Sequence, residues 1–490
     1  MRPINADLDR VVEEVNQTLG VGVSFDVLYR PIDFSGMRLA VYGLNGFFQS
    51  LFVFDIVKAV ERVAQRLAEN KVHGAKVKAL GDAIYAELPF VQVDRTKDLE
   101  KALINIMSGP IAIFVDGQSE AILVDTRLYP ARNPDDPAVE RVVRGPRDGY
   151  TETLVTNVAL TRRRLRDPGL RFELHQVGQR SKTDVCLVYI NDIVNPDLLA
   201  AVRKKIQGIQ VDGIPMAEQS IEEFLIDNKW NPYPMARYTE RPDVVATHLL
   251  QGYMAIFVDT SPEVIILPTT FVDHVQHPED YHQTPLSGTY MRWILLLSVI
   301  LSVLLPPVWL ALIQFAPSMP ALHWVVPHKE SSIPIWMQMI FAEVGMDILR
   351  RAVINTPMTL GNALGIVAGV IFGQTAVTVG LYSAEVMVFM AVTFVASFAT
   401  SSPELAAANR LVRMMLLILT TLIGPWGCVV GILGWFALLG RSRSFGVPYF
   451  WPILPFHFYG FKQMLVREPL PDIKTRISAV HPVDPDKRTG

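Results

Sequence analysis

Charge is almost absent from a long part of the second half of this 490-residue chain. Between 293 and 440 only ten of 148 residues are charged. The uncharged runs cover 293–328, 352–384, 386–403 and 414–440. Since about 20 apolar residues suffice for a helix to cross the hydrocarbon core of a bilayer, this part predicts a helical membrane domain over 291–440.

The expected number of membrane segments is four or five, because some of the apolar runs are short or interrupted. The first segment is interrupted by Pro306 and Pro307, and the last breaks at GPWG (424–427). The run 386–400 is short enough to be re-entrant. Arg441 and Arg443 follow the last apolar run and favour a cytoplasmic tail over 441–490. Arg410 and Arg413 do not fit a count of positive charges on the cytoplasmic side, so no topology is assigned.

The first 290 residues have a different character. They mix charged and apolar residues as a water-soluble α/β protein does, and 1–20 contains no apolar leader, so we expect this part to stay in the cytoplasm. The net charge of −3 argues against a nucleic-acid partner. The two cysteines, Cys186 and Cys428, are too few for a disulfide framework and too far apart for a metal site.

This first part repeats itself. GPIAIFVDGQSEAILVDT (109–126) matches GYMAIFVDTSPEVIILPT (252–269), and two upstream strand patterns, 24–30 and 39–46, meet 171–177 and 186–193 at a shift of 147 residues. Each copy reads strand, strand, helix, helix, strand, strand. The pattern predicts two related α/β subdomains, 1–130 and 150–290, joined by a linker over 131–149. We expect each to be a small mixed sheet with helices against it, and the repeated FVD to be a turn without chemistry.

Five motifs point to a family. They are GPRDGYTETLVTNVALTRRRLRDPGL (145–170), VGQRSKTDVCLVYI (177–190), YTERPD (238–243), PEDYH (278–282) and SFGVPYFWPILPF (444–456). In this order they closely resemble the A-subunit family of bacterial spore germinant receptors, the GerA family, and LGVGVSFDVLYR (19–30) is most like one branch of it. The resemblance implies a protein of the spore inner membrane, and a homo-oligomeric ion channel, a pentamer by analogy, that releases monovalent cations during germination. It also admits another small spore membrane protein as a partner.

The chain departs from the family in one place. Where the family usually reads something like FELLREAGIRLP, this chain has MDILRRAVINTP (346–357), so that Arg351 replaces an acid and Asn355 a base. If those side chains shape conduction, selectivity or gating differs here from the receptor branch.

Glycines recur every fourth residue in GNALGIVAGVIFGQTAVTVG (361–380). Gly361, Gly365, Gly369 and Gly373 share a helical face and allow a neighbouring backbone to approach closely, and helix packing alone explains them. A pore hypothesis adds two observations: polar residues that suit water rather than lipid, and apolar residues that could form a narrow constriction. The polar ones are Asn362, Gln374, Thr375 and Thr378, and the constriction candidates are Ile366, Val367 and Val370.

The preceding segment, IWMQMIFAEVGMDILRRA (335–352), carries its charges on one helical face. One interpretation is an interfacial amphipathic helix in which Asp347 pairs with Arg350 or Arg351. The other is that Glu343 and Asp347, repeated around an oligomer, form an acidic ring that draws cations to a pore mouth.

Enzyme motifs are lacking. There is no GxSxG, no GxxxxGK[ST], and SKT (181–183) has no phosphate-binding glycines, so we expect no enzyme and no cofactor. His274, His277 and His282, with Glu279 and Asp280, match no standard metal site, so we expect no metal either. Two alternatives to the channel stay open: a non-conducting scaffold for germination complexes, and a component of dipicolinate and calcium transport, which would predict a basic pore.

Overall fold

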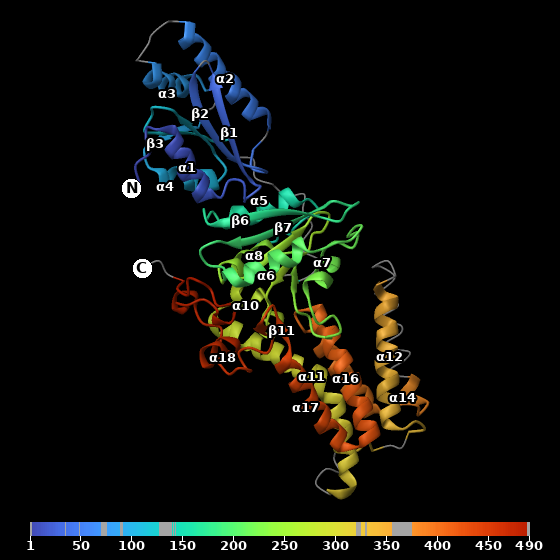
Figure 1. The fold of residues 1–490 in the computed structure, drawn as a ribbon. Coiled ribbons are helices and arrows are strands. Elements are labelled where there is room, and N and C mark those ends of the chain that lie inside the picture. Colours follow the sequence, from blue (N-terminus) through green and yellow to red (C-terminus); the bar gives the residue numbers. More distant parts are fainter. Residues whose placement is uncertain are drawn as a thin grey trace. The chain divides into compact units, whose positions relative to one another are not determined.

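The computed structural model describes residues 2–487, apart from 35, 49, 70–75, 89–91, 127–139, 141, 143, 320–324, 329–330 and 355–374. The chain forms two compact units (Figure 1). An α/β unit comprises 1–227, 236–268 and 471–490, and a helical unit comprises 228–235 and 269–470. The predicted boundaries differ from these, since only 471–490 of the tail expected over 441–490 joins the α/β unit, and the expected border at 290/291 falls inside a helix.

The α/β unit contains the same succession of elements twice. The first copy is α1 (Leu8–Leu19), β1 (Val27–Phe34), β2 (Met37–Leu44), α2 (Ser50–Glu69), α3 (Lys76–Glu87), β3 (Val93–Thr96), α4 (Leu99–Met107), β4 (Ile111–Val115) and β5 (Ala121–Val124). The second is α5 (Leu154–Arg164), β6 (Leu170–Val177), β7 (Thr183–Ile190), α6 (Pro196–Gln207), α7 (Ala217–Leu225), β8 (Arg237–Thr239), α8 (Pro242–Leu249), β9 (Met254–Val258) and β10 (Val264–Leu267).

The two sheets share one topology. Their strand orders are β1-β2-β4-β5-β3 and β6-β7-β9-β10-β8, which agrees with the expected duplication. Every neighbouring pair is antiparallel, so the expectation of mixed sheets was wrong. The sequence pattern also missed β3 and β8, because edge strands of four and three residues are too short to show an alternation.

Helices cover both faces of each sheet. In the first copy α1 and α4 bury Tyr42 and Phe114 on one face, while α2 covers Ile113 and Val115 on the other. In the second copy α5 and α8 enclose Phe172 and other apolar residues in an equivalent core. The strands β4 and β9 are buried along their whole length, as their uniformly apolar sequences predict.

The repeated FVD phrase has a structural role in each copy. Asp116 follows β4 and its Oδ1 accepts a hydrogen bond from the backbone N–H of Leu8, at the start of α1, at 3.3 Å. Asp259 follows β9 and accepts in the same way from Leu154, at the start of α5, at 3.1 Å. The carboxylate therefore satisfies an N–H that a helix start leaves unpaired, and ties the turn to the first helix of its copy.

The two copies are joined by a buried ion pair. Arg162, in the basic stretch at the end of α5, donates from Nε and Nη2 to Oδ2 of Asp26 in the first copy, at 3.0 and 2.9 Å. Both side chains are almost fully buried. Nearby, Arg164 donates to Asp148; although partial burial opposes it, these hydrogen bonds hold the pKa of Asp148 below its ordinary value. Two arginines of the basic stretch, Arg162 and Arg164, thus pair with carboxylates, while Arg163 and Arg166 are exposed.

The helical unit contains the apolar segments. Its helices are α9 (Phe271–Val275), α10 (Glu279–His282), α11 (Pro285–Phe315), α12 (Ile335–Ile354), α14 (Ala376–Thr378), α15 (Ala384–Phe398), α16 (Pro403–Ile423), α17 (Pro425–Arg441) and α18 (Phe458–Leu465), with a two-stranded ladder, β11 (Arg443–Ser444) and β12 (Val447–Pro448). Among the described residues, 285–318 and α16 are long and apolar enough to cross a membrane, and α15 and α17 are shorter apolar helices. The expected break at GPWG is confirmed, since α16 and α17 separate at Gly424.

Candidate functional site in the helical unit

Two helices of this unit, α15 and α16, bury polar residues among apolar ones, and their exposed residues are apolar. On α16, Asn409, Arg413 and Thr420 are buried, whereas Leu411 and Met415 are exposed. The same holds on α15, where Thr393 and Ser397 are buried, and Val388, Val392, Val395 and Phe398 are exposed. This polarity is the reverse of that of a helix on a water-soluble protein, whose apolar stripe faces the core.

A buried ion pair lies where three of these helices meet. Arg413 of α16 donates from Nε to Oε1 of Glu343 at 2.5 Å and from Nη2 to Oε2 at 2.8 Å. Both side chains are only 1% exposed. The third nitrogen, Nη1, donates to the backbone oxygen of Ser302 on α11. A two-pronged pair of this geometry uses most of the hydrogen-bonding capacity of both groups, which is what makes their burial tolerable.

The oxygen of Ser302 is available because of a proline. Pro306 has no N–H, so the residue four positions earlier, Ser302, loses its helical donor inside α11. Arg413 supplies that donor from α16. The proline pair that the sequence marked as an interruption thus creates the acceptor that joins α11 to the ion pair.

A second ion pair links α12 to α16. Arg410 donates from Nη1 to Oδ1 of Asp347 at 2.8 Å, and the Asp347 side chain is 45% exposed. Asp347 was expected to pair with Arg350 or Arg351 on its own helix, but its partner lies on α16. The guanidinium of Arg350 instead lies over the ring of Phe398 on α15, 5.1 Å from its centroid.

Both acidic-ring candidates therefore meet arginines inside one chain. Glu343 is enclosed and neutralised by Arg413, while Asp347 keeps a half-exposed carboxylate. Whether either lines a pore in an oligomer stays a prediction.

A polar group missed in the sequence lies one turn before Arg413. Oδ1 of Asn409 accepts a hydrogen bond from the hydroxyl of Tyr233 at 3.1 Å, and that hydroxyl accepts from Nε1 of Trp435 at 2.6 Å. Burial raises the pKa of Tyr233, so its phenol stays protonated and can donate. Tyr233 comes from 228–235, a loop that belongs to the helical unit although its neighbours in sequence do not. The sequence signal was NPYP (231–234), a turn with an apolar aromatic inside it.

Most pore candidates lie outside the described residues. These are Asn362, Ile366, Val367, Val370 and Gln374. The helix-packing glycines, Gly361, Gly365, Gly369 and Gly373, and Asn355, where the chain departs from the family, also lie outside them. Thr378 ends the short helix α14 and is exposed, and Arg351 on α12 is also exposed.

The histidine-rich stretch before α11 is not gathered around one point. The ring of His274 is buried between the hydroxyls of Thr269 and Ser402, each at 3.2 Å. Nδ1 of His277 instead accepts from the backbone N–H of Glu279, and Asp280 lies 3.5 Å from Arg292. Within the described part of the chain, no three His, Cys, Asp or Glu side chains are grouped as a metal site would require.

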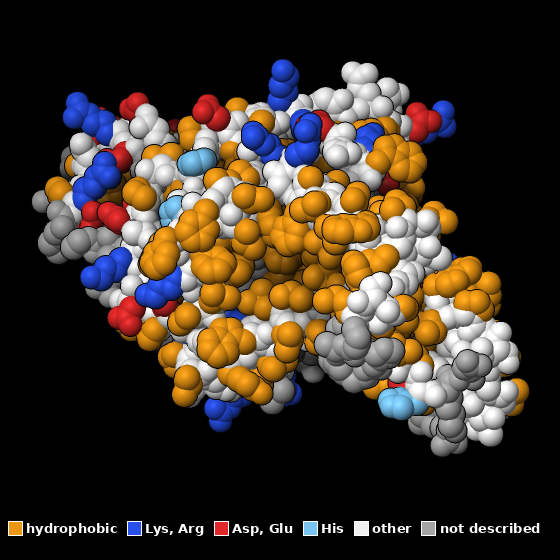
Figure 2. Space-filling view, turned by 90° about the horizontal axis from the view of Figure 1, so that it is seen from below, with side chains coloured by type: hydrophobic (Ala, Val, Ile, Leu, Met, Phe, Trp, Pro, Cys, Tyr) orange, Lys and Arg blue, Asp and Glu red, His pale blue; other side chains and the backbone are white. Residues whose placement is uncertain are grey.

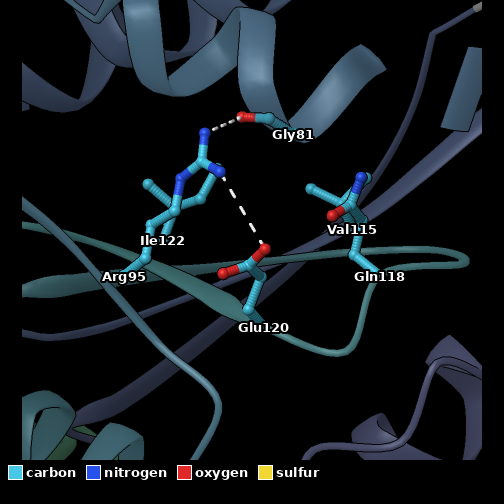
Figure 3. A pocket seen from close by; sticks show the side chains of 6 residues that line it. All are labelled: Gly81, Arg95, Val115, Gln118, Glu120 and Ile122. Atoms are coloured by element: carbon cyan, nitrogen blue, oxygen red, sulfur yellow. Dashed lines mark hydrogen bonds and ion pairs between the residues drawn. The ribbon is translucent and has the colours of Figure 1, made fainter. Parts of the chain in front are cut away.

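The α/β unit has a shallow hollow on the first sheet, lined by Gly81, Arg95, Val115, Gln118, Glu120 and Ile122 (Figure 3). The guanidinium of Arg95 reaches across it, donates to the Gly81 oxygen at 3.2 Å and lies 3.9 Å from Glu120 (Figure 3). The same side chain bonds Asp82 and lies over the ring of Tyr85. Because the only strongly charged donor there is already engaged, the hollow offers no evident ligand site.

Comparison with known proteins places the chain in a family. The family model described as Bacillus/Clostridium GerA spore germination protein matches residues 13–479. Stage V sporulation protein AF of Bacillus subtilis (strain 168) is 39% identical over 96% of this chain and 94% of its own length. The uncharacterized membrane protein YfkQ of the same organism is 30% identical over 96% of this chain and 90% of its own.

One solved structure is also similar. The N-terminal domain of the A subunit of the Bacillus megaterium spore germinant receptor GerK3 is 25% identical, with a TM-score of 0.42, over 55% of this chain and 97% of that one. The family model and the relatives confirm the resemblance drawn from the five motifs. They also confirm the branch that the sequence of residues 19–30 favoured. The chain belongs to the GerA family of spore germination proteins.

Proposed function

We propose that this protein is a membrane-spanning subunit of a homo-oligomeric channel that releases monovalent cations across the spore inner membrane during germination. The observation that carries the membrane part of the proposal is the reversed polarity of α15 and α16. An apolar exterior suits a hydrocarbon solvent, and ionisable groups inside a membrane face the interior of the bundle and pair with one another.

The surface of the molecule supports this assignment. Figure 2 shows a broad area of hydrophobic side chains on one face, with charged side chains gathered toward its edge. The exposed apolar residues of α17, Val430 and Leu433 among them, add to those of α15 and α16. A surface this apolar is rare on a soluble monomer and fits lipid or neighbouring subunits. The α/β unit, with charged residues on its surface, would lie in the cytoplasm.

Conduction is the finer part of the proposal. It rests on the family and on the polar and apolar residues of 361–378, with Ile366, Val367 and Val370 as the constriction and Gln374 and Thr378 as polar lining. Asp347, half exposed on α12 just before this segment, is the remaining acidic candidate for attracting cations. A ring of such subunits, a pentamer by family analogy, would bring these residues together around one axis.

A flux assay tests the proposal. The purified full chain, alone or with a co-expressed small spore membrane protein, is placed in liposomes loaded with potassium, and efflux is followed with a potassium-sensitive dye. We expect efflux from the wild type, and a higher basal leak in Val370→Ala or Val367→Ala, because a smaller side chain widens an apolar constriction. Val388→Ala, a truncation on the exposed face of α15, is the matched control and should change nothing.

Other outcomes would favour the alternatives. A stable oligomer that passes no potassium or sodium would argue for a non-conducting scaffold. Efflux of dipicolinate with calcium, and none of potassium, would argue for a transport component. If Val370→Ala and Val388→Ala behaved alike in a conducting protein, the pore would have to lie elsewhere.

A further inference from the structure

An exposed apolar stripe on α11 begins well before the apolar run in the sequence. Five residues spaced by four, three, four and three positions share one face of the helix and are 50% to 83% exposed. They are Leu286, Tyr290, Trp293, Leu297 and Ile300. Since the spacing follows the helical repeat, the stripe is continuous from the first turn of α11 into its uncharged part.

The helix is longer than a membrane requires. Its 31 residues extend about 46 Å, whereas a bilayer core is about 30 Å thick. About ten residues therefore project beyond the hydrocarbon core. If the uncharged run occupies that core, the projecting residues are those around Leu286 and Tyr290, which lie before Trp293.

A second apolar element is held against this end of α11. The carbonyl oxygens at the end of a helix lack partners within the helix, and those at the end of α18 are satisfied by α11 side chains. Arg292 donates to the oxygen of Gln463 at 2.6 Å, and Nε1 of Trp293 donates to that of Leu465 at 2.9 Å. Arg292 is itself buried, and these hydrogen bonds join α18 to the start of α11.

The turn 454–457 and the first residue of α18 then expose apolar side chains. Phe456 and Phe458 are 64% and 73% exposed, and Leu454 is also exposed. Exposed Arg441 and Arg443 precede this segment in the chain. Exposed aromatic and basic residues are both typical of the layer where a bilayer meets water.

We propose that residues 285–294 of α11 and residues 454–466 together form an interfacial anchor that lies in the phospholipid headgroup layer of the membrane that α11 crosses. This rests on the membrane part of the proposed function, and adds a lipid contact that fixes the depth of the helical unit. A lipid surface is the occupant because the stripe continues without a break along α11 into the spanning part.

Lipid crosslinking on the unmodified full chain tests this. The protein is reconstituted in vesicles of three parts phosphatidylethanolamine to one part phosphatidylglycerol, with a trace of a photoreactive phospholipid. One probe carries a diazirine next to the headgroup and the other carries it at the end of the acyl chain. Mass spectrometry then maps the modified peptides. We expect adducts of the shallow probe on 286–294 and 454–466, and adducts of the deep probe on 411–422. We expect adducts of neither probe on 217–225 of the α/β unit.

The outcomes separate the anchor from the proposal on which it rests. Deep adducts on 411–422 without shallow adducts on 454–466 would overturn the anchor and leave the spanning helices standing. Missing deep adducts on 411–422 would overturn the membrane assignment, and the anchor with it.

A variant pair gives an independent measurement. Phe458→Asp should reduce shallow adducts on 454–466 several-fold while deep adducts on 411–422 persist, because a charge at this position resists entering the interface. Phe224→Asp, on the exposed part of α7, should leave both unchanged. Equal shallow labelling of the two variants would contradict the anchor.

Discussion

At the scale of single residues, the charges of the apolar half have partners that no local pattern reveals. Glu343 and Arg413 are 70 positions apart and meet only because α12 and α16 pack together. The sequence predicted that Glu343 and Asp347 share a helical face. It showed no partner for Arg410 and Arg413, and these two arginines agreed with no membrane topology. The pairing depends on helix packing, and the spacing of residues along one helix carries no information about it.

Breaking the Arg413 and Glu343 pair should strongly destabilise the helical unit. Arg413→Leu leaves a buried carboxylate without a partner, and we expect a loss of about 3–5 kcal/mol in the free energy of unfolding. Adding Glu343→Leu should recover most of it, because two apolar side chains replace two charges. The midpoint of thermal unfolding in detergent measures both.

The half-exposed pair provides the control for this experiment. Arg410→Leu leaves Asp347 in contact with solvent or headgroups, and should cost roughly 1 kcal/mol or less. If Arg413→Leu were no worse than Arg410→Leu, or if the double variant were as unstable as the single one, the buried pair would not have the role assigned to it.

The repeated turns of the α/β unit differ at one residue whose backbone matters. After Asp116 the first copy has Gly117 with φ 77°, and after Asp259 the second has Thr260 with φ 73°. A β-branched residue is strained in this left-handed region, whereas glycine is not. We expect Thr260→Gly to stabilise the α/β unit by up to about 1 kcal/mol, and Gly117→Thr to destabilise it by at least as much. Unfolding followed by urea titration would show the opposite signs, and equal signs would contradict this account.

At the scale of elements, hydrophobic pattern predicted which segments are strands and helices, but not their register. The sequence alignment of the two copies matches Tyr42 with Tyr189, at a shift of 147. In the sheets, Tyr42 lies opposite Ala112, and the residue opposite the equivalent Ala255 is Val188, at a shift of 146. A slip of one residue moves every side chain to the other face of a sheet. Tyr42 accordingly bonds Asn16 on α1, while Tyr189 faces the side of α6 and Arg203.

The faces of the apolar helices were equally hidden, because α16 has apolar residues all round. The structure shows which side of α16 is exposed, and Met415 lies on that side. We expect Met415→Lys to cost about 2.5–3.5 kcal/mol of insertion free energy near the helix centre and to reduce the protein retained in membranes after an alkaline wash.

The matched substitution is Met216→Lys, at an exposed methionine beside α7 in the α/β unit, which should be retained like the wild type. Equal retention of both variants would mean that the exposed side of α16 does not face lipid.

At the scale of the whole molecule, the fall in charge after 292 predicted two parts, and the structure has two units. Their true limits could not be read from composition. The loop 228–235 is flanked in sequence by the α/β unit yet packs in the helical unit through Tyr233, and the tail from 471 returns to the α/β unit, where Arg476 donates to the oxygen of Leu250 at 2.9 Å. Such returns depend on three-dimensional packing rather than on local hydropathy.

The most direct test of the proposed channel is its ion selectivity. The purified oligomer is inserted into a planar bilayer between two potassium chloride solutions of unequal concentration, and the voltage at which current reverses is measured. A cation channel with acidic and neutral lining residues should reverse near the potassium equilibrium potential. The absence of conductance from an intact oligomer, or reversal near the chloride potential, would contradict the proposed function.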